Sequence, residues 1–256
     1  MKFRVLLASA AVAAFLSPVV ADEPSPVYEL RIYTCNEGKL PDLLARFRDH
    51  TCALFEKHGI TNIGYWTPIH AEDGADTTLL YVLKHDSREA AKASFKAFGQ
   101  DPEWKAAREA SEANGKILAK PPQSVFMKAT DFSPGLEVSA RQPARTFELR
   151  TYTTPAGKLE NLHSRFRDHT IDLFSKHGMT HVCYWNPIDE KDGAGTTLIY
   201  ILAHESEEAG KASFAAFRQD PDWIAAKAAS EKEGSLTVPD GVKSIYMSPA
   251  DFSPLK

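Results

Sequence analysis

The stretch ELRIY at residues 29–33 recurs as ELRTY at residues 148–152, and RFRDHT at residues 46–51 recurs unchanged at residues 165–170. Both recurrences have an offset of 119 residues. At this offset about 53 of the 87 residue pairs that begin with Glu29 and end with Gly115 are identical. The chain therefore contains two homologous copies of about 110 residues, which are domain-sized units and not the short, numerous repeats of a solenoid.

The end of each copy recurs with one extra residue. The tail DFSP at residues 131–134 returns at residues 251–254, an offset of 120, so one residue has been gained before the last strand of the second copy. We expect a first domain over residues 22–134, a linker over residues 135–145, where Pro143 helps to break the periodicity, and a second domain over residues 146–256.

Each copy predicts the same order of elements. In the first copy, apolar patterns and turn residues predict strands at 27–34, 60–67, 77–85 and 125–128, a helix at 40–58, and a helical region from residue 87 that restarts at residue 101. The order βαββαβ is that of the ferredoxin-like fold, an α+β fold in which both helices cover one face of an antiparallel sheet. The other face of the sheet needs a cover, and we expect the two halves to pack sheet to sheet as an intramolecular pseudo-dimer.

The first 21 residues predict an export signal. A cationic start at residues 1–4 precedes an apolar run at residues 5–16, and small residues precede a cleavage site after Ala21. This run is too short to span a bilayer, and no other stretch is long and apolar enough to do so. We therefore expect a product that is periplasmic or secreted after cleavage near Ala21, without an integral membrane segment.

The composition is that of a globular protein. Hydrophobic residues make up 43% and charged residues 25% of the 256 residues, and the formal net charge of −4 gives no global basic field, so we expect no nucleic acid as a partner. Three cysteines are too few for a disulfide scaffold. Because Cys35, Cys52 and Cys183 have no cysteine counterparts in the other copy, a shared catalytic cysteine or a symmetric metal site is disfavoured, and at least one thiol is free or paired between chains.

Polar and apolar residues alternate along the first strand. Glu29, Arg31 and Tyr33 share one face, and the second copy repeats this set as Glu148, Arg150 and Tyr152. We expect the apolar face of the strand to pack on the helices, which sends the polar set into the space between the sheets. Two interpretations stay open, namely an anchor for an anionic or carbonyl-bearing ligand and an ion pair that satisfies internal charges.

Four further residues complete the candidate ligand-binding set. His50 and His169 lie at the edge of the apolar stripe of their helices, where a partly buried histidine serves as a base, an axial ligand or a pH switch, or simply packs in the core. Tyr65 and Tyr184 lie on the second strand of each copy, where they wall a pocket or belong to the core. No catalytic residue is assigned.

Other histidines receive structural roles or none. His58 and His177 precede a glycine at the end of a helix, which favours capping of the last carbonyl groups. His85 and His204 end a strand, and nothing in the pattern gives them a role. The motifs HExxH, CxxC, GxGxxG and GxSxG and the P-loop are absent, so hydrolase, nucleotide and zinc functions lack support and no metal site is expected.

The combination of motifs resembles the NIPSNAP family. The resemblance rests on YELRIY at 28–33, the Gly38-Lys39 pair, FEKHG at 55–59, YW at 65–66 and DPEW at 101–104, and each piece has a counterpart in the second copy. It covers nearly the whole chain after residue 21 and implies two tandem NIPSNAP domains that form a dimeric α/β barrel. That superfamily includes cofactor-free monooxygenases and haem-handling enzymes alongside many proteins of unknown activity.

Two functions remain open at this stage. The first is an exported NIPSNAP protein that binds a small molecule or a partner without turnover, which the lack of a recognisable catalytic set favours. The second is an oxidoreductase of the monooxygenase or haem-associated type, with a site between sheet and helices. The cofactor is unknown, with haem as the alternative, and a small-molecule ligand and a homo-oligomer are the expected partners.

Overall fold

The two halves of the chain form the same succession of elements, with four strands each. The computed structural model describes residues 26–256, so the predicted signal peptide at residues 1–21 lies outside the described residues. The first half contains β1 (Val27–Thr34), α1 (Leu40–Arg46), η1 (Phe47–Thr51), α2 (Cys52–Lys57), β2 (Thr61–Pro68), η2 (Ala71–Asp73), β3 (Thr78–His85), α3 (Arg88–Gln100), α4 (Pro102–Ser111) and β4 (Gln123–Ala129). The second half contains β5 (Thr146–Thr153), α5 (Leu159–Arg165), η3 (Phe166–Thr170), α6 (Ile171–Lys176), β6 (Thr180–Pro187), η4 (Glu190–Asp192), β7 (Thr197–His204), α7 (Glu207–Gln219), α8 (Pro221–Ser230) and β8 (Val242–Pro249).

Local sequence signals explain where the helices begin and end. The helix predicted at 40–58 is present and contains one π-helical turn, η1, at the RFRDHT stretch. Gly59 follows it with a φ of 75°, a left-handed conformation that glycine adopts without strain. The predicted break before the next helical stretch lies at Asp101, whose carboxylate accepts a hydrogen bond from the backbone N–H of Glu103 (2.8 Å) and so begins α4.

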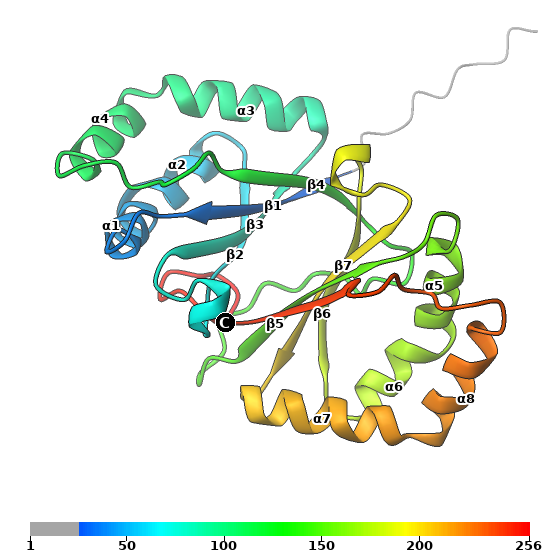
Figure 1. Ribbon diagram of the computed structural model, residues 1–256. Helices are drawn as coiled ribbons and strands as arrows, with labels where there is room; N and C mark the ends of the chain where they lie inside the picture. Colours follow the sequence, from blue (N-terminus) through cyan, green and yellow to red (C-terminus); the bar gives the residue numbers. More distant parts are fainter. Residues whose placement is uncertain (1–25) are drawn as a thin grey trace, which may run out of the picture.

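The eight strands close into one antiparallel barrel that both halves share. The order around it is β1-β3-β2-β8-β5-β7-β6-β4, with β4 paired back to β1. The last strand of each half pairs with the second strand of the other, β8 with β2 and β4 with β6, so the joints are reciprocal. Figure 1 shows the helices of the first half on one side of this barrel and those of the second half on the other. The predicted α+β fold and pseudo-dimer are confirmed.

The barrel interior is apolar, which corrects one prediction about the first strand. Leu30 of β1 packs there in one cluster with Leu149 of β5 and with Trp66, Trp185 and other residues of both halves. Arg31 instead pairs in register with Tyr81 of β3, which belongs to the cluster beneath the helices. The polar face of β1 therefore lies under the helices and not between the sheets. The physical reason is that a closed barrel of eight strands excludes water, whereas the layer beneath the helices supplies polar partners.

The DFSP tails cross from one half to the other. Ser253 Oγ accepts a hydrogen bond from the backbone N–H of Tyr65 (2.9 Å), and Ser133 Oγ accepts one from Tyr184 (2.9 Å). Arg48 donates two hydrogen bonds, both 2.7 Å long, to the carboxylate of Asp251. The repeat of this tail is thus explained by two reciprocal contacts between the halves.

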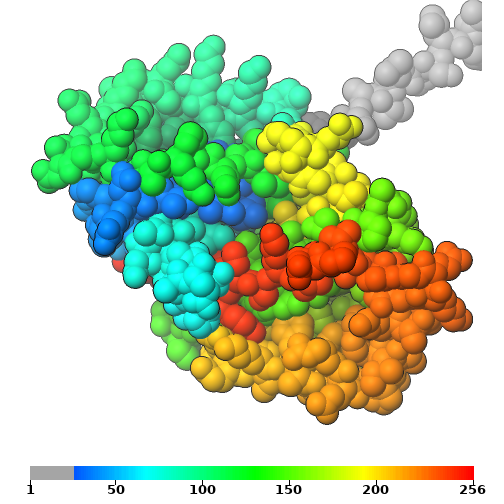
Figure 2. Space-filling view, in the orientation of Figure 1, coloured from blue at the N-terminus to red at the C-terminus, as the bar shows by residue number. Residues whose placement is uncertain are grey.

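The surface reflects the same arrangement. In Figure 2 the red surface of the C-terminal strand lies against the cyan surface of the first half, as expected from the pairing of β8 with β2.

Within residues 26–256, no helix has the length and apolar character needed to cross a membrane.

Candidate functional site

A buried polar network lies on the helix-facing side of β1. Arg31 Nη1 and Ser124 Oγ both donate hydrogen bonds to Glu29 Oε1 (2.5 Å each), and His85 Nε2 lies 3.1 Å from Glu29 Oε2. The side chains of Glu29 and His85 are each 1% exposed. Burial alone would raise the pKa of Glu29, but the hydrogen bond with His85 and the charge of Arg31 outweigh it, so the pKa of Glu29 is lowered. Glu29 is therefore ionised at neutral pH and holds Arg31 in place.

The second half repeats this network. Glu148 accepts a hydrogen bond from Arg150 and another from Ser244, and His204 Nε2 lies 3.0 Å from Glu148 Oε2. Arg150 Nε also donates to the hydroxyl of Tyr200 (3.0 Å), as Arg31 Nε does to Tyr81 (2.8 Å). The internal ion pair, one of the two interpretations of this strand, is thus present in both halves.

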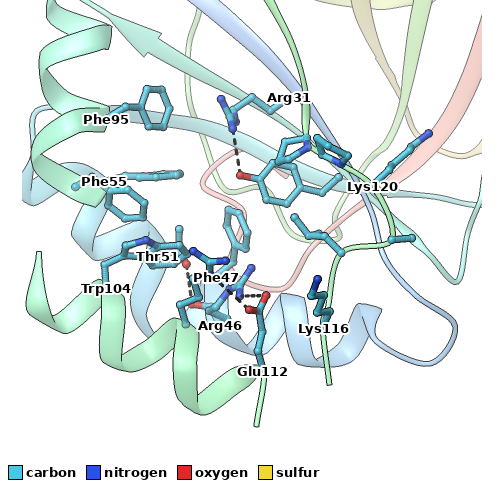
Figure 3. Close-up of a pocket in the computed structure, with 17 residues that line it drawn as sticks. Arg31, Arg46, Phe47, Thr51, Phe55, Phe95, Trp104, Glu112, Lys116 and Lys120 are labelled. Atoms are coloured by element: carbon cyan, nitrogen blue, oxygen red, sulfur yellow. Dashed lines mark hydrogen bonds and ion pairs between the residues drawn. The ribbon is translucent and has the colours of Figure 1, made fainter. Parts of the chain in front are cut away.

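A cavity of about 610 Å³ opens beside Arg31 in the first half. It lies between β1, the helices α1 to α4 and the loop that joins α4 to β4. Its lining is made up of Arg31, Tyr33, Arg46, Phe47, Thr51, Phe55, Phe95, Phe98, Trp104, Arg108, Glu112, Lys116, Leu118, Ala119, Lys120, Pro121 and Pro122. Figure 3 shows Arg31 and Phe95 on one side of this space, Arg46 and Trp104 opposite, and Lys116 and Lys120 on a third side. The volume is that of a typical small-molecule site.

Arg46 supplies an inner positive charge. Its side chain is 3% exposed, and its Nη1 lies 3.2 Å from Ser111 Oγ and 3.5 Å from Glu112 Oε1, the latter at the limit of a hydrogen bond. Its Nε is buried and has no hydrogen-bond partner. Burial lowers the pKa of Arg46, although a guanidinium group stays charged in proteins. A buried cation with an unused donor favours an anionic ligand.

The rim of the cavity adds further positive charge. Lys116 and Lys120 are exposed, and neither forms an ion pair within the described part of the chain. Arg108 shares the carboxylate of Glu112 with Arg46 (Nε–Oε2 3.5 Å). The lining thus carries five cationic side chains and one carboxylate.

Aromatic rings form the walls between these charges. Arg31 lies over the ring of Phe95 (4.9 Å to its centroid), and Arg46 lies over that of Trp104 (5.2 Å). Phe98 packs on Trp104 with ring centroids 4.4 Å apart. The cavity therefore combines apolar walls with a strongly positive field, which suits a small organic anion that has an aromatic or aliphatic body.

The structure separates the predicted ligand-binding residues. Arg31 and Tyr33 line the cavity, and Arg31 Nη2 donates to the hydroxyl of Tyr33 (3.2 Å), whereas Glu29 lies behind Arg31 in the network described above. Tyr65 is buried beneath the helices, stacked on Tyr81 with centroids 5.2 Å apart, and does not line the cavity. In the second half, Arg150 donates to Tyr152 (3.2 Å), and Tyr184 lies 2.6 Å from His181 Nδ1.

The prediction that His50 and His169 are partly buried is wrong. Both are exposed, and they line shallow depressions between the π-helical turns and helices α4 and α8. The π-helical turn inserts an extra residue into the helix, which rotates these side chains off the apolar stripe that straight helical spacing predicts.

Sequence reasoning missed several residues that organise the site. His85 and His204 recur in both copies, and this repetition was a usable signal for the buried network. His58 is the C-cap residue of α2, as expected, but its side chain bonds a carboxylate and not the last carbonyl groups. Its Nε2 lies 2.7 Å from Asp101 Oδ2 and so ties the end of α2 to the start of α4. Trp104 and Arg46 also recur, but only the fold brings them to one cavity.

Metal ions and haem need ligands of particular chemistry. Within residues 26–256 no group of three or more histidine, cysteine, aspartate or glutamate side chains is placed to hold a metal ion. The cavity lining contains no histidine, cysteine or methionine to serve as an axial ligand, and the hydroxyl of Tyr33 already accepts a hydrogen bond from Arg31. A histidine-ligated haem therefore does not fit this cavity.

Comparisons with known proteins agree with the fold. The family model described as NIPSNAP matches residues 28–134 and 147–254. Two similar crystal structures are presumed monooxygenases, one from Fusobacterium nucleatum (12% identity, TM-score 0.57, 89% of this chain and 93% of that chain) and one from Lactobacillus acidophilus (11% identity, TM-score 0.55, 88% and 94%). A presumed chlorite dismutase is similar at 13% identity and a TM-score of 0.50, over 89% of this chain and 96% of that chain. No curated protein matches the sequence significantly.

Proposed function

The chain belongs to the NIPSNAP family, with one family domain in each half, and on this premise we propose that it binds a small organic anion in the cavity of the first half. The single observation that carries this proposal is the position of Arg46, a buried cation, in the wall of an aromatic-lined cavity. The Nε of Arg46 is unpartnered, but so is that of Arg165, so the cavity and not the free donor distinguishes the first half. The network of Glu29 and His85 orients Arg31 on the opposite side. Together they favour a carboxylate or a similar group attached to an apolar body.

Binding without turnover is the form of the proposal that the residues support. A general base or nucleophile would have to lie within hydrogen-bond reach of a ligand in the cavity. The lining offers arginines, lysines, one glutamate and the hydroxyl groups of Tyr33 and Thr51. The glutamate already faces Arg46 and Arg108. The Tyr33 hydroxyl accepts a hydrogen bond from Arg31, and the Thr51 hydroxyl donates one to the carbonyl oxygen of Arg46. The similar structures named as monooxygenases and as a chlorite dismutase share the fold alone, because their identity to this chain is 11–13%.

The proposal includes export of the protein. It rests on the apolar run and the small residues before the expected cleavage site within residues 1–21. Mass measurement of the protein recovered from the periplasm or medium of an expressing cell tests this part, with a mature chain that begins at Asp22 as the expected result. A full-length chain retained in the cytoplasm contradicts export and leaves the binding site untouched.

The binding test uses the mature chain and a matched pair of variants. Calorimetry with 2-naphthoate measures Kd for the native chain, Arg46→Lys and Arg165→Lys. Arg165 is the equivalent of Arg46 and is equally buried, so we expect both substitutions to disturb the packing to a similar extent. We expect Arg46→Lys to weaken binding about tenfold, because an ammonium group cannot donate two parallel hydrogen bonds to one carboxylate as a guanidinium does. We expect Arg165→Lys to leave Kd unchanged.

Three outcomes oppose the proposal. Equal effects of the two variants, or no binding of 2-naphthoate or of its homologues with longer apolar bodies, would contradict an anion site in this cavity. A parallel sample receives haem. A Soret band in the native chain that is lost in Tyr33→Phe would indicate that the cavity binds haem and not a small organic anion. Thermal unfolding of each variant is the control that checks whether the fold is retained.

A further inference from the structure

The two copies differ where the cavity meets solvent. The rim residues Lys116 and Lys120 correspond, at the offset of 119, to Ser235 and Pro239, and Ala119 corresponds to Val238. The hydroxyl of Ser235 is used within its own turn, where it donates to the carbonyl oxygen of Thr237 (2.8 Å). The second copy therefore lacks both lysines of the rim.

The inner arginines also differ in how well they are neutralised. Arg165 Nη1 lies 2.8 Å from Glu231 Oε1, whereas the equivalent distance from Arg46 to Glu112 is 3.5 Å. In the first half Glu112 also faces Arg108, so one carboxylate serves two arginines. Positive charge is thus less compensated in the first half, both inside the cavity and at its rim.

From these differences we infer that the chain has one working site, in the first half, and that the site takes an organic dianion. One anionic group lies at Arg46 inside the cavity, the second lies between Lys116 and Lys120 at the rim, and the apolar body lies along Phe98 and Trp104. This inference rests on the proposed function and adds the charge and stoichiometry of the ligand.

The charges at the site explain why a second anionic group adds affinity. Glu29 neutralises Arg31, and Glu112 partly neutralises Arg46 and Arg108, but no carboxylate within the described residues pairs with Lys116 or Lys120. A monoanion bound at Arg46 leaves these two ammonium groups without a counter-charge. A second anionic group at the rim pairs with them and improves both affinity and association rate at low salt.

The experiment compares two ligands with the same apolar body. Calorimetry measures Kd of 2-naphthoate and of naphthalene-2,6-dicarboxylate for the mature chain, for Lys116→Ser/Lys120→Gln, and for Lys227→Gln/Lys232→Gln. The last variant removes the same two charges from the second half and controls for net charge. We expect the dicarboxylate to bind the native chain and the control about five- to tenfold more tightly than the monoanion, and to lose this advantage in Lys116→Ser/Lys120→Gln.

The outcomes separate this inference from the proposed function. If 2-naphthoate binds and the dicarboxylate binds no better, the dianion is wrong and the proposed site stands. If neither ligand binds, the proposed function fails. Native mass spectrometry measures stoichiometry, and two ligands per chain at saturation would overturn the single site, whereas one ligand per chain supports it. Loss of the advantage in the control as well would assign it to net charge and overturn the role of the rim.

Discussion

Arg88 in the first half donates a hydrogen bond to Asp189 in the second half (3.0 Å), and at the reciprocal contact an acidic residue takes the place of Arg88. At the offset of 119, Arg88 corresponds to Glu207 and Asp189 corresponds to His70, and His70 Nε2 lies 2.8 Å from Glu207 Oε1. The two halves thus contact each other through unlike residues. A pairing of two first halves would place His70 against Arg88, and a pairing of two second halves would place Asp189 against Glu207. This difference favours pairing of a first half with a second half.

The first prediction concerns this contact. Arg88→Glu places a carboxylate against Asp189, and we expect it to lower the free energy of unfolding by about 1 kcal/mol, because both side chains are partly exposed. Arg88→Glu/Asp189→Arg restores opposite charges and recovers most of the loss. Urea unfolding of the native chain, the two single variants Arg88→Glu and Asp189→Arg, and the double variant measures the coupling in a double-mutant cycle. A coupling of zero would mean that the contact does not help to select the partner half.

The second prediction concerns the crossed tails. Ser253→Ala removes the acceptor for the buried N–H of Tyr65, and we expect a loss of about 1–3 kcal/mol in the free energy of unfolding. Ser133→Ala has the same effect through Tyr184. Ser248→Ala, at an exposed position of β8, is the control and changes stability little. Equal stability of all three variants would show that the tails do not fasten the halves.

The fold was predictable because the sequence signals that start and end its elements are local and occur in both copies. Strand alternation at 27–34, the glycine at 59 and the Asp101-Pro102 helix start are short-range signals, and the second copy repeats each of them. The pseudo-dimer followed from one bare sheet face and a homologous copy to cover it. Which face of the first strand lies under the helices could not be predicted in the same way. Both faces are largely covered, and only the closure of the barrel decides which one faces the helices.

The site was predictable only in part. Arg31 and Tyr33 were found because they alternate with apolar residues on one strand. His50 was misplaced because the π-helical turn breaks the spacing of 3.6 residues on which the prediction relied. Lys116 and Lys120 carried no repeat signal, since the second copy lacks them, and only the three-dimensional structure brings their loop to the cavity.

The third prediction concerns the thiols. Burial raises the pKa of Cys35, Cys52 and Cys183 to about 11, and none of the three forms a disulfide. At pH 7 only about one thiol in ten thousand is then the reactive thiolate. We expect no reaction of the native chain with a disulfide reagent within minutes, and three reactive thiols in guanidinium. A thiol that reacts rapidly in the native chain would contradict this.

The fourth prediction concerns acid stability. Asp101 accepts hydrogen bonds from Lys57, His58 and the N–H of Glu103, and these lower the pKa of its carboxyl below the ordinary 3.8; Asp220 has the equivalent partners. A lowered pKa in the folded state means that the unfolded chain binds protons first as the pH falls. The stabilisation is therefore present above about pH 4 and is lost below it.

Asp101→Asn/Asp220→Asn tests this assignment, because asparagine also begins helices well but carries no charge. We expect the free energy of unfolding of the native chain to fall more steeply from pH 5 to pH 2.5 than that of the double variant. Asp49→Asn, at an exposed position, serves as the control and keeps the native slope. If the double variant also keeps that slope, other carboxylates dominate the acid transition.

The fifth prediction separates structure from ligand binding in the buried networks. Glu29→Gln leaves the partly buried guanidinium of Arg31 without its counter-ion, and Glu148→Gln does the same to Arg150. Because the two networks have the same partners and burial, we expect each variant to lose about 3 kcal/mol in urea unfolding. Equal losses would mean that both networks serve the fold, and the site then depends on what lies around the network in the first half. A loss smaller by more than about 1 kcal/mol in Glu29→Gln would instead mean that the first network is held under strain beside its cavity.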